Sequence, residues 1–147
     1  MHGRFRWAAP LVVAAGVLAV IAPVAANAAE PVALPLDTAT TVDGIEVACT
    51  GIGQTRDDPR WTAYSVRIEF SDAKSEYLAD ASVSLTDSAG QPLLAVTCDG
   101  PWVLLKLKEG VYKVQASLTG STAKPRSAAV KPPPKGQIRV VLQFPDA

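Results

Sequence analysis

Histidine is almost absent from this sequence, and its scarcity excludes more functions than any residue that is present. The one histidine of the chain is His2, close to the N-terminus. Without an imidazole elsewhere, the chain has no general base for a Ser-His-Asp or Cys-His nucleophile system. It also lacks the usual nitrogen ligand of protein metal sites. We therefore expect a protein that is not an enzyme and that holds no metal and no cofactor.

Cysteine is also scarce, with only Cys49 and Cys98 in the chain. Two cysteines alone cannot complete a four-ligand zinc site. In an exported protein an even number of cysteines favours a disulfide. A bridge between these two would close a loop of about fifty residues and add roughly 4 kcal/mol to the free energy of unfolding in the chain-entropy model. The alternative is two buried free thiols.

Neither sign of charge dominates, because 14 basic residues balance 14 acidic ones. Arg4 and Arg6 stand in the N-terminal segment, so the rest of the chain is slightly acidic. No basic face is expected, and nucleic acid is excluded as a partner on this ground.

The N-terminus has the pattern of a secretory signal. After the two arginines, "AAPLVVAAGVLAVIAPVAANA" runs without a charge from Ala8 to Ala28 and ends in the small-x-small triplet at residues 26–28. We predict a signal helix over residues 1–28, cleavage after Ala28, and a periplasmic or secreted protein without stable membrane insertion. The alternative is an uncleaved membrane anchor, which Pro10 and Pro23 disfavour.

Beyond residue 28 no segment has a helical period, and apolar residues alternate with polar ones instead. "AYSVRIEF" is the clearest case, with Tyr64, Val66, Ile68 and Phe70 on one face. Residues 29–43, with two prolines and a run of threonines, predict a disordered lead-in. Strands are expected within 45–49, 63–70, 81–86, 94–98, 102–107, 112–118, 126–130 and 138–144. Turn signals such as "DSAGQP" and "CDGP" separate them. The pattern predicts an all-β fold, an antiparallel β-sandwich of seven or eight strands in one domain over residues 44–147.

A family pattern of apolar alternation followed by spaced glycines, a leucine and a tyrosine begins at residue 81 and continues into the stretch "TCDGPWVLLKLKEGVYKVQASLTG", residues 97–120. The residues concerned are Ala81, Val83, Leu85, Asp87, Gly90, Thr97, Gly100, Trp102, Leu104, Leu107, Gly110 and Tyr112. Over about residues 77–144 the chain resembles the carboxypeptidase regulatory-like domain, a transthyretin-like β-sandwich, as found in small exported bacterial proteins. The resemblance implies a non-catalytic module. It also implies that Trp102 and Tyr112 point into the core and that the Tyr112 hydroxyl bonds to backbone.

Two aromatic residues are candidates for ligand contact. Trp61 lies in the polar segment "TRDDPRW" and Tyr77 in a second loop. An exposed tryptophan stacks on a sugar ring or anchors a protein partner; the alternative is that Trp61 folds over the sandwich as a plug. The acids of these loops, Asp57, Asp58, Asp72, Glu76 and Asp80, do not form a calcium-loop pattern and are expected to be solvated.

Three functions compete at this point. The first is a structural or protein-interaction module of the cell envelope, pairing through an edge strand. The second is a carbohydrate-binding module that uses exposed aromatics. The third, a hydrolase, is the least favoured. The expected partner is accordingly an envelope protein or a glycan.

Overall fold

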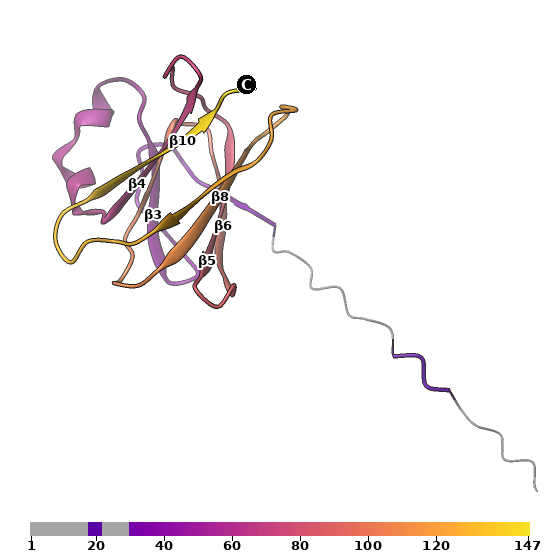
Figure 1. The fold of residues 1–147 in the computed structure, drawn as a ribbon. Helices are drawn as coiled ribbons and strands as arrows, with labels where there is room; N and C mark the ends of the chain where they lie inside the picture. Colours follow the sequence, from indigo (N-terminus) through magenta and orange to yellow (C-terminus); the bar gives the residue numbers. More distant parts are fainter. Residues whose placement is uncertain (1–17, 22–29) are drawn as a thin grey trace, which may run out of the picture.

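Ten strands between residues 32 and 144 pair into two sheets of five, packed face to face. The computed structural model describes residues 18–21 and 30–147 (Figure 1). Sheet A has the order β1 (Val32–Ala33), β6 (Pro92–Cys98), β5 (Ala81–Asp87), β8 (Tyr112–Leu118), β9 (Arg126–Val130). Sheet B has the order β10 (Ile138–Phe144), β4 (Val66–Asp72), β7 (Trp102–Leu105), β3 (Ile45–Thr50), β2 (Thr40–Val42). Two 3₁₀ helices, η1 (Gly53–Asp57) and η2 (Pro59–Ala63), connect β3 to β4.

The prediction of an all-β sandwich is confirmed, but its strand count and its purely antiparallel pairing are wrong. The described residues form ten strands, and β1 pairs with β6 and β10 with β4 in parallel. The two extra strands, β1 and β2, have two and three residues, which is too short to show a period of two. Parallel pairing joins segments far apart in the chain, so no local turn signal indicates it.

The lead-in predicted to be disordered over residues 29–43 instead contains β1 and β2. Leu34 is buried in the core, and its backbone N–H donates to the carbonyl of Thr97 at 3.0 Å. Asp37 N–H donates to the carbonyl of Cys49 at 2.8 Å. The segment is ordered because prolines do not prevent its few apolar side chains from packing at a sheet edge.

The predicted signal helix over residues 1–28 lies outside the described residues, apart from 18–21. Neither of the short helices in the described ranges has the length or the apolar character needed to cross a membrane.

The core fills the space between the two sheets with alternate side chains from both. Phe70 of β4 and Phe144 of β10 from sheet B meet Leu85 of β5 and Val96 of β6 from sheet A, all essentially unexposed. Burying a side chain of this kind contributes about 1.5–3 kcal/mol. The alternation also sends every second residue of β4 to the outer face of sheet B, where the candidate site lies.

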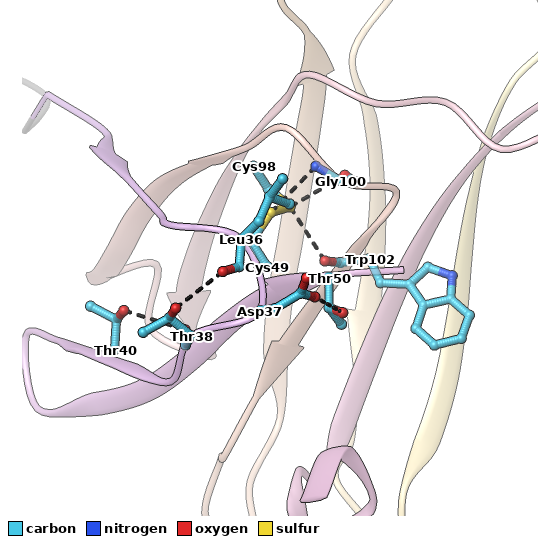
Figure 2. Close-up of a disulfide and its surroundings, with 9 residues drawn as sticks. All are labelled: Leu36, Asp37, Thr38, Thr40, Cys49, Thr50, Cys98, Gly100 and Trp102. Atoms are coloured by element: carbon cyan, nitrogen blue, oxygen red, sulfur yellow. Dashed lines mark hydrogen bonds between the residues drawn. A yellow bond between two sulfur atoms is a disulfide. The ribbon is translucent and has the colours of Figure 1, made fainter. Parts of the chain in front are cut away.

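The predicted disulfide is present and joins the two sheets through the core. Cys49 on β3 and Cys98 on β6 are both fully buried, with their Cα atoms 5.5 Å apart (Figure 2). The backbone N–H of Gly100 donates to the sulfur of Cys49 at 3.4 Å. A Cβ atom at Gly100 would lie 2.6 Å from the carbonyl oxygen of Thr50. Gly100 is therefore required because two backbone segments approach closely beside the bridge.

The structure confirms the prediction for Tyr112 and corrects the prediction for Trp102. Tyr112 is partly buried, packs against the core and donates its hydroxyl to the carbonyl of Lys108 at 3.0 Å. Trp102 is buried as expected, but it lies on the outer face of sheet B rather than between the sheets. Its neighbour Val103 takes the inward position, and Figure 2 shows the indole pointing away from the disulfide.

Candidate functional site

A buried carboxylate marks the outer face of sheet B. Val66, Ile68 and Phe70 of β4 face the core, so Arg67 and Glu69 lie on the opposite face. The Glu69 side chain is fully buried, a rare state for a glutamate unless it is paired. An ionised group in this position requires charged or hydrogen-bonding partners.

Glu69 has three such partners, drawn from β4, β10 and the loop after β4. The hydroxyl of Tyr77 donates to Glu69 Oε1 at 2.8 Å. Arg139 Nε donates to Glu69 Oε2, and Arg67 Nε lies 3.7 Å from the same oxygen. Arg67 and Arg139 are direct partners in the parallel register of β4 and β10. Two guanidiniums therefore share one carboxylate, which leaves one positive charge in excess within this cluster.

Trp102 forms the aromatic floor beside this cluster. The Arg67 guanidinium lies 4.4 Å from the Trp102 ring centroid, a cation–π contact. Tyr77 meets Trp102 edge to face, with ring centroids 6.1 Å apart. Within the described residues, the buried atoms Arg67 Nε and Trp102 Nε1 have no hydrogen-bond partner. These contacts fix the arginine and both rings relative to one another.

Two hollows flank the cluster. The first, here called the Tyr77 hollow, has a volume of about 370 Å³ and is lined by Ser71, Ser75, Tyr77, Arg139, Val141 and Gln143. The second, about 210 Å³, lies between the 3₁₀ helices and β4, and its lining includes Arg67, Trp102 and Gln137. The Tyr77 hollow combines one aromatic ring, one guanidinium and several neutral hydrogen-bonding groups.

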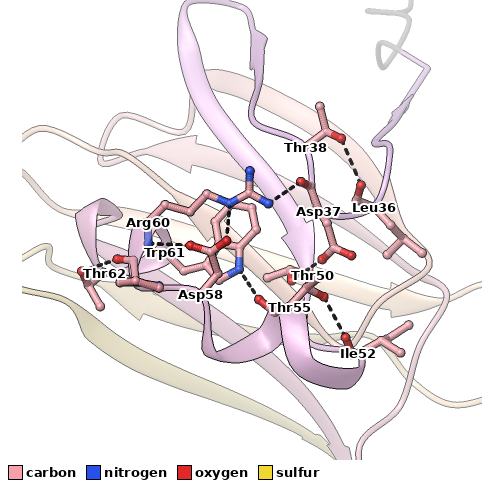
Figure 3. A network of polar contacts seen from close by, with 11 residues as sticks. Leu36, Asp37, Thr38, Thr50, Ile52, Thr55, Asp58, Arg60, Trp61 and Thr62 are labelled. Atoms are coloured by element: carbon pink, nitrogen blue, oxygen red, sulfur yellow. Dashed lines mark hydrogen bonds and ion pairs between the residues drawn. The ribbon is translucent and has the colours of Figure 1, made fainter.

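Trp61 covers a different part of the same sheet face. It is only 3 % exposed and packs with Tyr64 against Ala48 and Leu104. Its indole N–H donates to the carbonyl of Thr55 at 2.7 Å, as Figure 3 shows. The structure thus places Trp61 as a cover over the outer face of sheet B.

Arg60 links the Trp61 cover to the segment that precedes β2 (Figure 3). Its guanidinium lies 4.2 Å from the Trp61 ring centroid. Its Nη2 donates to the carbonyl of Asp37 at 2.8 Å, and its Nε lies 3.1 Å from Asp58 Oδ2. Asp58 also accepts a hydrogen bond from the backbone N–H of Arg60 at the start of η2. Arg60 and Asp58 therefore stabilise η2 and its contact with the segment around Asp37.

A second cluster of polar side chains, Glu46, Tyr64 and Lys106, lies beside Trp61. The Tyr64 hydroxyl donates to Glu46 Oε1 at 3.0 Å, and Lys106 Nζ lies 2.9 Å from the same oxygen. Burial, and then the hydrogen bond to Glu46, raises the pKa of Tyr64 to about 12. Hydrogen bonds from Lys106 and Tyr64 lower the pKa of the Glu46 carboxyl.

The predicted contact residues Trp61 and Tyr77 have different environments. Tyr77 is 47 % exposed and borders a hollow, whereas Trp61 is buried. Among the loop acids, Asp72 accepts hydrogen bonds from the backbone N–H groups of Lys74 and Glu76 in a turn. The described residues contain no group of three metal-ligating side chains.

Sequence reasoning missed the three charged members of the cluster, Arg67, Glu69 and Arg139. Their outward positions follow from the alternation in β4 and β10. Their proximity does not, because it depends on the parallel pairing of strands about seventy residues apart. No model of a known protein family matches the chain. No curated protein matches it either.

Proposed function

We propose that the protein is a non-catalytic, exported β-sandwich module of the cell envelope that acts by binding, with carbohydrate as its ligand. One observation carries this proposal: Tyr77 is about half exposed and yet held in place beside a polar hollow. Its hydroxyl is tied to Glu69, and its ring packs against Trp102 in an edge-to-face pair. A fixed aromatic face costs little conformational entropy when a ligand stacks on it.

The surroundings of Glu69 support a binding role rather than a catalytic one. Its carboxylate accepts hydrogen bonds from Tyr77 and Arg139 and lies close to Arg67. A general acid or base needs a carboxyl group within reach of the substrate. The fully buried Glu69 instead serves to position the groups around it.

Fluorescence titration with a panel of neutral and acidic envelope glycans tests the proposal. Trp102 contacts Tyr77, so a sugar on Tyr77 is expected to change tryptophan emission. Tyr77→Ala is expected to abolish the change, whereas Tyr112→Phe, on the other sheet, is expected to keep it. An unchanged spectrum across the whole panel contradicts carbohydrate binding.

A second candidate function is protein interaction through an edge strand. It is favoured by β9, an edge strand that pairs with β8 alone among the described strands and whose Ser127 and Ala129 are small and exposed. An extended peptide adds to such an edge by backbone hydrogen bonds. Affinity capture from envelope extract is expected to yield a partner with the wild type and to lose it with Ala129→Lys. Equal capture by both proteins would contradict pairing at β9.

The resemblance to the carboxypeptidase regulatory-like domain is part of the same proposal. The two-sheet architecture supports it, as do Gly100 and Gly110, which both lie in turns between strands. A crystal structure superposed on solved domains of that family tests it, and a different strand order in the sheets would contradict it.

A further inference from the structure

The cluster beside the Tyr77 hollow has one more positive charge than negative charge. Glu69 supplies one negative charge to two guanidiniums, Arg67 and Arg139. The Arg67 guanidinium is further engaged with the Trp102 ring. Arg139, whose side chain is 55 % exposed, lines the hollow. Because the single negative charge of Glu69 is shared between two guanidiniums, it does not neutralise Arg139 completely, and a ligand in the hollow can reach Arg139.

Arg139 presents this charge in a fixed orientation. Its Nε donates to Glu69, and within the described residues no hydrogen bond engages its two Nη groups, so the end of the guanidinium can still pair with a ligand. The planar fork of an arginine binds a carboxylate through two parallel hydrogen bonds. Since Glu69 is itself fully buried and held by Tyr77, the fork is organised before any ligand arrives.

The carboxylates of the neighbouring turn do not cancel this charge within the hollow. Asp72 and Glu76 are not among the residues that line it. Asp72 Oδ1 accepts two backbone hydrogen bonds inside the turn, from Lys74 and Glu76. The lining therefore includes one cationic group and no anionic one.

The rest of the lining matches a ligand with several hydroxyl groups. Ser71 and Ser75 contribute hydroxyls, each able to donate and to accept. Gln143 donates its Nε2 to the carbonyl of Asp72 at 3.0 Å, so its Oε1 is oriented as an acceptor. Tyr77 adds an apolar ring face. A volume of about 370 Å³ is near the lower end for ligand pockets and suits one sugar unit.

From this arrangement we propose that the Tyr77 hollow binds a uronic acid unit of an acidic polysaccharide. The sugar carboxylate pairs with the Arg139 fork, the apolar face of the sugar ring packs on Tyr77, and its hydroxyls bond to the serines and Gln143. An acidic peptide side chain would pair with the arginine and leave the hydroxyl and amide groups of the hollow to water. This inference rests on the carbohydrate-binding function proposed above.

Isothermal titration calorimetry with trigalacturonate and its fully methyl-esterified form tests the inference. The ester keeps the ring and its hydroxyls but removes the negative charge. We expect the ester to bind at least about tenfold more weakly, a difference typical of a lost charge-assisted pair. Arg139→Gln is expected to weaken trigalacturonate to the level of the ester. The control Arg126→Gln, at an exposed arginine of sheet A, is expected to bind like the wild type.

A second variant keeps the test valid if Arg139→Gln fails to fold. Gln143 is exposed, so Gln143→Ala should leave the fold intact and weaken both sugars by the same factor. Equal binding of acid and ester would overturn the uronate inference while leaving carbohydrate binding standing. Binding of neither sugar, together with silence across the glycan panel, would overturn both. If triglutamate binds as tightly as trigalacturonate and depends on Arg139 in the same way, the ligand of the hollow is an acidic peptide and the uronate inference is overturned.

Discussion

Replacing Glu69 by glutamine tests whether its buried carboxylate holds the outer face of sheet B together. The change keeps the size of the side chain and its capacity to accept from Tyr77, but removes its charge. At 3.7 Å from Arg67, the lost attraction is about 4.5 kcal/mol at an effective dielectric constant of about 20. The glutamine also avoids the cost of burying a charge, and the half-exposed Arg139 regains water. We expect a net loss of about 3 kcal/mol in the free energy of unfolding, the lower end for breaking a buried pair.

Urea unfolding followed by tryptophan fluorescence measures this loss. Glu76→Gln provides the control, because Glu76 is exposed on the adjacent turn and its change is expected to stay within about 0.5 kcal/mol. The two variants differ only in whether the carboxylate is buried among arginines. A loss below about 1 kcal/mol for Glu69→Gln would refute the reasoning, since the carboxylate would then not be holding Arg67 and Arg139.

Three further predictions concern the core and the Trp61 cover. Replacing Cys49 and Cys98 together by alanine should lower the free energy of unfolding by about 4 kcal/mol; urea unfolding that shows a loss under about 1 kcal/mol would contradict this. Gly100→Ala should cost roughly 2–3 kcal/mol, because its Cβ would lie 2.6 Å from the Thr50 carbonyl oxygen, and an unchanged melting temperature would disprove the close approach. Tyr64 should ionise near pH 12 in an ultraviolet titration. Its raised pKa contributes stability that is complete below pH 10, the ordinary tyrosine pKa, and is lost as the pH rises from 10 to about 12. The ionisation step near pH 12 should vanish in Tyr64→Phe, and a variant that keeps it would contradict the assignment.

The sandwich could be predicted from the sequence wherever a strand was long enough to alternate. β4 is the best example, because Val66, Ile68 and Phe70 all face the core as their spacing indicates. The prediction that Tyr64 shares their face is wrong, because β4 begins only at Val66 and Tyr64, at the end of η2, packs with Trp61 on the outer face of sheet B. β1 and β2 could not be predicted, since two or three residues give no period. The positions of such short strands are set by the backbone hydrogen bonds of the neighbouring strands and not by the pattern of their own side chains.

The candidate site was predicted only in part. Tyr77 is predicted as a contact residue and borders a hollow, but the alternation in β4 places Glu69 only on the outward face and does not predict its burial. Glu69 is buried because Tyr77 and Arg139 cover it, and one of them comes from a strand about seventy residues away. Alternation tells which face a residue occupies, not what lies over that face.

Because β10 pairs with β4 and is synthesised last, the candidate site can form only when the chain is nearly complete. Synthesis proceeds from the N-terminus, so β4, β7 and the partners of the disulfide are complete long before residue 138 is made. Until β10 docks, Glu69 lacks Arg139, and the Tyr77 hollow lacks the wall that carries the guanidinium and Gln143. A chain truncated before β10 would lack Arg139 and Gln143 and, on the binding proposed above, would not bind an acidic sugar, so ligand binding would report that the chain is complete.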